Sequence, residues 1–220
     1  MRPDDHGGKS MQAADRLGVE ELSSNDRYAL IETVEHAKLV EAVQAHAKLP
    51  SPVKTAYLCI NGIVVAALAG AWLASGISFL AGFPNLCLGM GLGYLVLMPI
   101  HELIHAWTYR RFGAKETRVV YNWRNLTAYC TADRFVVNGR EFVWICLMPF
   151  LVLNSLILAV IAALGGFVPL LWGMLLLHVS ACSGDAAFVN LAWAHRETGL
   201  WTYDDSSSAS TYFYVPRSVS

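Results

Sequence analysis

Long apolar segments alternate with polar segments along this 220-residue chain. Four of them reach the ~20 residues that a helix needs to cross the hydrocarbon core of a bilayer. They cover residues 57–81, 86–109, 142–164 and 169–194. The short, uncharged connections at 82–85 and 165–168 are typical of helical hairpins. The pattern therefore predicts an all-α integral membrane protein, a bundle of four transmembrane helices.

The composition agrees with this pattern and excludes other classes of protein. Hydrophobic residues make up 55% of the chain, charged residues only 15%, and the mean hydropathy is +0.41. Soluble domains carry about a quarter charged residues. All 16 Lys and Arg lie within 2–54, 110–140 and 196–217, outside the apolar segments. An ordinary soluble enzyme and a charged disordered chain are excluded, and a net charge of −1 argues against a nucleic-acid partner.

The charges also predict an orientation. The loop at 110–140 carries seven Lys and Arg, and the positive-inside rule places such loops in the cytoplasm. The first fifty residues lack the apolar core of a signal peptide, so the first span is expected to act as an uncleaved insertion signal. We expect a multi-pass protein of the plasma (inner) membrane, with both termini cytoplasmic. Its oligomeric state is left open.

The polar segments divide the chain into three parts. Residues 1–52 are expected to form a cytoplasmic tail (1–25) and an amphipathic helix from Asp26 to Lys48. That helix would lie either on the protein's own soluble face or on the membrane surface. The transmembrane domain covers 53–200, and 201–220 form a C-terminal tail.

The central loop at 110–141 carries strand signals. Val119, Tyr121 and Trp123 alternate with polar residues, and Asn138-Gly139 between apolar runs is a strong hairpin signal. The loop is expected to hold two or three short strands, as a small cytoplasmic β-hairpin region. A polar connector without strands is the alternative.

The sequence His101-Glu102-Leu103-Ile104-His105 matches H-E-x-x-H. On a helix, positions i and i+4 share a face, so both imidazoles can bind one zinc and the glutamate can reach the water on the metal. Composition alone predicts about 0.009 such matches in this chain. Glu102 is also the one acid of its apolar segment, where a buried charge costs about 3 kcal/mol. A polar cluster that holds helices together is the alternative to a metal site.

Zinc catalysis needs three protein ligands and one open position, and Asp185 is the best candidate for the third ligand. It is the one acid between Glu141 and Glu197. Counted from the charged cytoplasmic ends of the two spans, Asp185 lies within about two helical turns of His101 and His105. Weaker candidates are His178, His195, Glu197 and Asp133.

Three further residues are expected near this site. His178 lies about 10 Å from Asp185 along one helix face, which is too far for both to bind one ion. It would orient a ligand, steady an oxyanion, or form a hydrogen bond with a neighbouring helix. Asn154 would contact the substrate backbone or form an interhelical hydrogen bond. Pro149 is expected to kink the third span and open space beside the metal.

An H-E-x-x-H helix in a membrane span, followed by an intramembrane aspartate, resembles the site-2 protease type of intramembrane zinc metalloproteases. The chain is more similar to the zincin peptidase family, small bacterial and archaeal proteins long classed as a domain of unknown function. The resemblance covers about 57–216 and includes Pro149, the stretch from His178 to Asp185, Tyr203-Asp204 and 212–216. It implies that His101, His105 and Asp185 bind one zinc and that Glu102 is the catalytic acid/base. The Asn-Pro-Asp-Gly stretch of the site-2 proteases and room for a PDZ domain are both absent.

The sequence therefore predicts a membrane-embedded zinc metalloprotease that hydrolyses peptide bonds of a membrane-associated substrate, a peptide or a membrane protein. Water activated by zinc would attack the peptide bond, with Glu102 as general base. An extended substrate would pair with an edge strand of the 119–137 region. The alternative is a non-catalytic membrane protein with a structural or sensory zinc site, which requires four protein ligands. A zinc transporter is disfavoured, because the single acid cluster gives no chain of sites.

Overall fold

A computed structural model describes residues 16–24, 26–122 and 127–217, and the chain is mostly helical (65%). Four helical stretches are long and apolar enough to cross a membrane. They are α3 (Pro52–Ser75), the continuous stretch Phe79–Arg111, α6 (Gly139–Leu164) and the stretch Pro169–Ala194. The second stretch contains α4 (Phe79–Leu92), the π-helical turn η3 (Gly93–Leu97) and α5 (Met98–Arg111). The fourth contains α7 (Pro169–Ala181) and α8 (Ser183–Ala194). The prediction of four apolar helices of spanning length is confirmed.

One of the two predicted helix connections is displaced. The first lies around Gly76, not at 82–85, because Gly76 adopts the left-handed conformation (φ 69°) that ends α3. The predicted connection at 82–85 instead lies inside α4, with Pro84 in the helix. The second connection begins at Gly165 (φ 64°), as predicted.

Two glycines let α4 and α7 approach each other closely. A Cβ atom on Gly89 would lie 2.0 Å from the carbonyl oxygen of Leu170, and one on Gly173 would lie 2.1 Å from that of Leu86. Helices that pack in an apolar solvent rely on small residues for such contact, because no hydrophobic force drives them together. The pair fixes the position of α7 and, through it, of α8.

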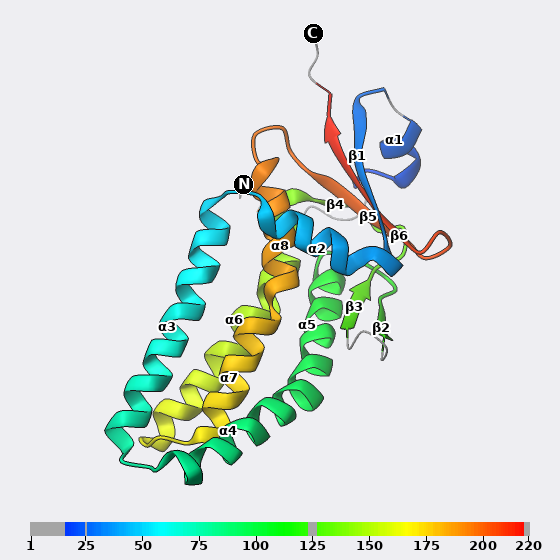
Figure 1. The fold of residues 1–220 in the computed structure, drawn as a ribbon. Coiled ribbons are helices and arrows are strands. Elements are labelled where there is room, and N and C mark those ends of the chain that lie inside the picture. Colours follow the sequence, from blue (N-terminus) through cyan, green and yellow to red (C-terminus); the bar gives the residue numbers. More distant parts are fainter. Residues whose placement is uncertain (1–15, 25, 123–126, 218–220) are drawn as a thin grey trace, which may run out of the picture.

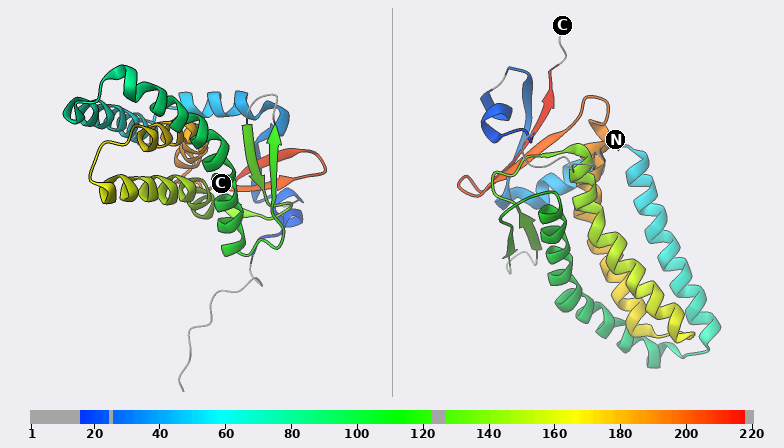
Figure 2. Two further views of the ribbon diagram at one scale, coloured as in Figure 1. Left: turned by 90° about the horizontal axis from the view of Figure 1, so that it is seen from below. Right: turned by 180° about the vertical axis from the view of Figure 1, so that it is seen from behind.

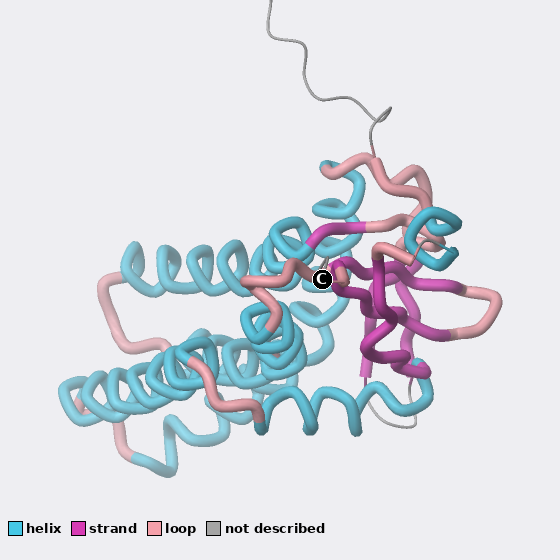
Figure 3. Tube along the Cα trace, turned by 90° about the horizontal axis from the view of Figure 1, so that it is seen from above, coloured by secondary structure: helices cyan, strands magenta, loops and turns pink. Residues whose placement is uncertain are grey.

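A four-stranded antiparallel sheet lies at one end of the helical bundle (Figure 1). Its strand order is β1-β6-β5-β4, and the strands cover Tyr28–Glu35, Ser210–Pro216, Trp201–Asp205 and Val137–Asn138. Seen from above, the strands gather on one side of the helices (Figure 3). The sheet joins segments from both ends of the chain and from the central loop.

This sheet corrects two predictions. The predicted helix from Asp26 to Lys48 is wrong for Tyr28–Glu35, which form β1, and only α2 (Leu39–Lys48) is α-helical. The predicted tail at 201–220 is wrong for β5 and β6. Both errors have one cause, because β1 pairs with β6 more than 170 residues away, and local spacing does not show such a partner.

Helix α2 lies across the sheet end of the bundle and packs on α8 (Figure 1). The amide of Asn190 in α8 donates hydrogen bonds to the carbonyl oxygens of His46 (2.8 Å) and Leu49 (2.9 Å) at the end of α2. The last carbonyls of a helix have no partner four residues further on, and here the N–H of Leu49 reaches only that of His46 (3.1 Å). Asn190 therefore caps α2 and fixes it beside the helix that carries Asp185.

The central loop contains a hairpin, but not where Asn-Gly predicts it. β2 (Arg118–Asn122) and β3 (Thr127–Thr131) pair antiparallel, which confirms short strands here; Trp123 lies outside the described residues. Figure 2 shows this hairpin beside the last turns of α5. The predicted turn at Asn138-Gly139 is wrong, because Asn138 caps α6 and forms a capping box with Glu141.

Part of the predicted N-terminal tail is ordered. Val19–Ser24 form α1, and Leu22 is completely buried against the outer face of the sheet. Arg16 forms two hydrogen bonds with the carboxylate of Glu141 (2.7 and 2.8 Å) and one with the carbonyl oxygen of Phe112 (2.8 Å). The prediction of a mobile tail is therefore wrong for residues 16–24. Residues 1–15 and 25 lie outside the described residues.

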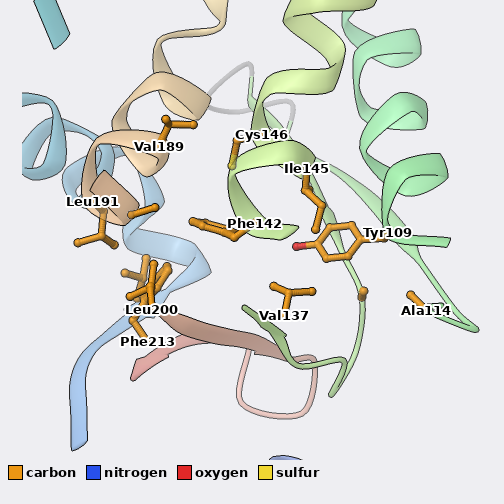
Figure 4. Packing of buried hydrophobic residues seen from close by; sticks show 13 residues of the cluster. Tyr109, Ala114, Val137, Phe142, Ile145, Cys146, Val189, Leu191, Leu200 and Phe213 are labelled. Carbon is orange, nitrogen blue, oxygen red and sulfur yellow. The ribbon is translucent and has the colours of Figure 1, made fainter. Parts of the chain in front are cut away.

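An apolar core joins the sheet to the helices. Phe142 lies between Tyr109 on one side and Leu200 and Phe213 on the other (Figure 4). The rings of Phe142 and Phe213 meet edge to face, with centroids 5.9 Å apart. Because this core begins one turn beyond His105, it links the position of the sheet to that of the H-E-x-x-H helix.

Candidate metal centre

The H-E-x-x-H residues lie in the middle of α5, on its buried face. His101 and Glu102 are each 3% exposed and His105 is 7% exposed, whereas Leu103 points outward. Residues four apart lie one turn apart on the same face. The π-helical turn η3 directly precedes α5, and such widened turns are frequent at functional sites. The helix thus directs all three polar side chains into the interior.

Three ligand atoms converge beside this helix. Nε2 of His101 lies 3.0 Å from Nε2 of His105. The carboxylate of Asp185 reaches both imidazoles, with Oδ2 3.0 Å from Nε2 of His101 and Oδ1 3.3 Å from Nε2 of His105. The side chains that the sequence places in two different spans therefore meet at one point.

Hydrogen bonds on the far sides of both imidazoles fix their tautomers. A carbonyl oxygen can only accept, so Nδ1 of His105 carries the proton that it donates to the oxygen of Ile145 (2.8 Å). Nδ1 of His178 donates to Oδ1 of Asn154 (2.8 Å), which leaves Nε2 of His178 to accept from Nδ1 of His101 (3.1 Å). Both Nε2 atoms then present lone pairs to Asp185, the form in which imidazole binds a metal.

A break between α7 and α8 brings Asp185 to this position. The fourth span is interrupted at Cys182 (ψ 11°), and Asp185 lies in the first turn of α8, where the helix dipole favours a negative charge. The hydroxyl of Tyr57 in α3 reaches the carbonyl oxygens of Val179 (3.1 Å) and Ser180 (2.8 Å) at the end of α7. The break is thereby stabilised from the neighbouring helix.

The donor set fits a divalent cation. Two imidazole lone pairs and a carboxylate that face one another repel unless a cation lies between them. Ligand atoms around a tetrahedral zinc are about 3.3 Å apart, close to the observed separations. Among the described residues, Oε2 of Glu102 and Oδ2 of Asp185 are buried without a hydrogen bond. His101, Glu102 and His105 also form one of two groups whose ligand atoms lie within 4.8 Å of one another.

The second such group lies on the other side of His101. It contains His101, His178 and Cys182, and all three side chains are buried. The thiol sulfur of Cys182 lies 4.0 Å from Nδ1 of His101 and 3.9 Å from Nε2 of His178. In this arrangement Nδ1 of His101, rather than its Nε2, would face a metal.

The converging side chains line one end of a cavity of about 180 Å³. Its middle is apolar, with Tyr109, Phe142 and Phe213 among the walls. Its other end, which we call the sheet end, is lined by Thr202 and Asp204 of β5, Thr211 of β6, and His36. The cavity thus connects the candidate metal centre with the inner face of the sheet.

The structure brings together most of the residues that the sequence predicts for the site. His101, Glu102, His105 and Asp185 meet directly, and His178 and Asn154 continue the hydrogen-bonded chain from His101. Of the weaker candidates, Glu197 pairs with Arg196 and Asp133 accepts from the backbone of Ser206. The prediction missed two features. One is the backbone carbonyl of Ile145, whose role no sequence pattern indicates, and the other is the sheet end of the cavity.

Comparison with known proteins agrees with this geometry. Residues 94–198 match the model of a family described as "Putative zincin peptidase". The match contains α5, α6, α7 and α8, and with them every converging side chain. No curated protein and no solved structure matches the chain.

Proposed function

We propose, from the zincin peptidase family match over residues 94–198, that this protein is a membrane-embedded zinc metallopeptidase. The match confirms the resemblance predicted from sequence. The observation that carries the proposal is the meeting of two imidazole nitrogens and a carboxylate at 3.0–3.3 Å, beside a buried glutamate with a free oxygen. The family match alone suggests a peptidase, and this geometry supplies the residues for it.

In this proposal His101, His105 and Asp185 hold one zinc ion through two nitrogens and one oxygen. Three protein ligands leave a position open, as in catalytic rather than structural zinc sites. Zinc in such a site lowers the pKa of water and polarises a carbonyl group. The hydrogen bonds of His105 to Ile145 and of His101 to His178 keep both imidazoles in the tautomer that binds.

Glu102 is the catalytic acid/base in this proposal. Its carboxylate takes the proton of the water that attacks the scissile carbonyl, and it returns a proton to the leaving amine. Its Oε2 atom accepts no hydrogen bond within the described residues and is therefore available for that water. Apolar side chains such as Tyr109 and Phe142 line much of the cavity beside it.

We further propose that the end of the helical bundle that carries the four-stranded sheet faces the cytoplasm. The membrane in this proposal is the plasma (inner) membrane. Six of the seven Lys and Arg of 110–140 lie within the described residues, and they belong to this end. Trp107, Trp144 and Trp193 are each more than 40% exposed and lie near the helix ends beside the sheet. Exposed tryptophans at helix ends are typical of the membrane–water interface. A membrane-associated peptide or membrane protein would then reach the site from the cytoplasmic side.

The test is cleavage by purified full-length protein in detergent with zinc. A peptide library prepared from a proteome digest serves as substrate, and mass spectrometry detects the products. We expect cleavage by wild type and a loss of at least about 100-fold in Glu102→Gln, because general base catalysis contributes about 10²–10⁴-fold. Glu116→Gln, the same change at an exposed position of the central loop, is the control. Equal cleavage by wild type and Glu102→Gln contradicts the proposal.

A second candidate is a structural or sensory zinc site without catalysis. The observation that favours it is the buried group of His101, His178 and Cys182. A metal held there would depend on the thiol, so Cys182→Ser would release it. The catalytic site instead predicts that Cys182→Ser keeps one zinc per chain in metal analysis and keeps its cleavage activity.

A further inference from the structure

One face of β5 forms the sheet end of the cavity. Thr202 and Asp204 are two residues apart, so both point to the same side of the sheet. Their partners across the strand pair, Phe213 and Thr211 of β6, line the same cavity. Asp205 points to the opposite side and contacts Arg134. Asp204 lies beyond residues 94–198, the part of the chain that matches the peptidase family.

Asp204 is a buried carboxylate without a cation. Its Oδ1 accepts from the hydroxyl of Thr211 (2.6 Å), and its Oδ2 accepts a long bond from the backbone N–H of Ala132 (3.4 Å). Among the described residues it has no ion pair, because the nearby Arg134 pairs with Glu20 and Asp205. A carboxylate has about four acceptor sites, so two of them remain for another donor.

The neighbouring imidazole does not compensate this charge. Nε2 of His36 lies 3.3 Å from the Thr211 hydroxyl that donates to Asp204. Burial lowers the pKa of His36, so its ring is neutral at neutral pH. Burial, opposed by the hydrogen bonds of Thr211 and Ala132, raises the pKa of Asp204 to about 6, and the group is still mostly ionised at pH 7. A negative charge therefore remains at the sheet end of the cavity.

A second polar group at this end, the hydroxyl of Thr202, lacks a hydrogen-bond partner among the described residues. Thr202 is only 2% exposed, and its hydroxyl oxygen is buried without a hydrogen bond among the described residues. Buried hydroxyl groups are nearly always hydrogen-bonded in folded proteins. Since Thr202 lines the cavity beside Asp204, a molecule bound there can satisfy both groups.

The space between the two ends is short and apolar. Cys130, at its edge, is within electrostatic reach of both Glu102 and Asp204; burial first, and then these two charges, raise its pKa to about 12. The aromatic walls Tyr109, Phe142 and Phe213 suit the aliphatic part of a long cationic side chain. The cavity thus spans from the candidate scissile position to the carboxylate of Asp204.

We propose that Asp204 binds a positively charged nitrogen of the peptide substrate, with Thr202 as a further hydrogen-bonding group, and so selects the substrate. This inference rests on the peptidase function proposed above. The nitrogen belongs either to a Lys or Arg side chain near the scissile bond or to the free amino terminus of the peptide. Both present the same ammonium-type chemistry to the carboxylate, and a charge-assisted bond of this kind contributes about 10- to 100-fold in selectivity.

The first test is the sequence preference in the peptide library. We expect wild type to prefer a basic residue at one fixed position near the cleaved bond, and Asp204→Asn to lose that preference about 10- to 100-fold. Cleavage of peptides without that residue should remain. Asp205→Asn removes the same charge from the opposite face of β5 and should keep the preference. Guanidination of lysine followed by acetylation separates the two sources, because only the free amino termini then lose their charge while both basic side chains keep theirs.

The second test measures binding without catalysis, as a shift of the thermal unfolding midpoint of the full-length protein in detergent. The probes are N-acetyl-lysine methylamide, norleucine methylamide with a free amine, and N-acetyl-norleucine methylamide without a cation. We expect one of the two cationic probes, and not the neutral one, to raise the midpoint of wild type. The three probes are compared on the wild-type protein alone, so this result does not depend on whether a variant folds. Asp204→Asn should lose the shift and Asp205→Asn should keep it.

The outcomes separate the two proposals. Cleavage without a basic or amino-terminal preference, or a preference that Asp204→Asn retains, overturns the cation subsite and leaves the peptidase standing. A midpoint that shifts equally with cationic and neutral probes overturns it as well. Absence of cleavage above the Glu102→Gln level, together with a cation-dependent shift that needs Asp204, overturns the peptidase function and supports the subsite.

Discussion

The two ends of the cavity both bury carboxylates, but they satisfy them differently. At the metal end, Asp185 faces two imidazoles, and hydrogen bonds to His178 and Ile145 orient those rings. At the sheet end, Asp204 has one hydroxyl, one long backbone bond and no cation among the described residues. A cation bound between the imidazoles and Asp185 would therefore compensate the charge at the metal end. The carboxylate at the sheet end would still lack a positive charge among the described residues. The two proposals assign this difference to a zinc ion at one end and to a substrate cation at the other.

The two carboxylates should differ most in their effect on zinc binding, which is measured by removing one carboxylate at a time. We expect Asp185→Asn to bind zinc at least about 100-fold more weakly, because even residues behind the ligands contribute 10- to 100-fold. Asp204→Asn should keep one zinc per chain, since it contacts none of the three converging side chains. Metal analysis and competition with a chelating dye measure both variants. Full zinc content in Asp185→Asn would exclude Asp185 as a ligand.

The free energy of unfolding should depend on pH through the buried carboxylate at the sheet end. Burial raises the pKa of Asp204 from 3.8 to about 6, so the folded state binds this proton more tightly than the unfolded chain. The stabilisation by the proton is complete below about pH 4 and is lost as the pH rises through 6. About two pKa units correspond to about 3 kcal/mol in the free energy of unfolding at pH 7.

Asp204→Asn should therefore be more stable than wild type at pH 7 to 8, and the advantage should vanish below pH 4. The measurement is the difference between the two unfolding curves from pH 4 to 8, in which the titration of other groups cancels. Asp205→Asn, which removes a partly exposed carboxylate, should show no such gain. A loss of stability in Asp204→Asn at pH 8 would show that the carboxylate stabilises the folded state, and it would contradict an unsatisfied charge that a ligand compensates.

The metal end could be predicted from sequence because its information is local. The spacing of His101 and His105 fixes their common face on any helix, and the scarcity of acids in the apolar segments singles out Glu102 and Asp185. The same scarcity of charged residues predicted the four long helices. Even here no local signal predicts the break at Cys182 that puts Asp185 at a helix start, because 169–194 has the length and hydropathy of one continuous span.

The sheet end could not be predicted, because its residues become neighbours only through long-range pairing. Val34 lies opposite Thr211, and Thr202 lies between Val137 and Phe213, so three distant segments build one face. The apolar residues of β1 fit a helical spacing as well as a strand, and Asn138 served as a helix cap instead of a turn. Nothing local marks Asp204 as buried.

The smallest expected effect tests whether Asn154, which contacts no converging ligand itself, orients the metal end. Asn154→Leu keeps the approximate shape but removes the oxygen that accepts from His178, so His178 no longer fixes the tautomer of His101. We expect zinc affinity to fall about 10- to 100-fold, as for other groups behind metal ligands. Competition titration with a chelating dye measures it.

Asn154→Asp keeps an acceptor at the same position and should restore the affinity, which a purely structural role for the amide would not require. Asn85→Leu, the same exchange in α4 where the amide donates to the carbonyl of Ala81, should leave zinc affinity unchanged. If Asn154→Leu binds zinc as tightly as wild type, the chain from Asn154 through His178 does not set the tautomer of His101. The backbone carbonyl of Ile145 would then be the one acceptor that orients the imidazole pair, and the metal end would depend on α6 alone.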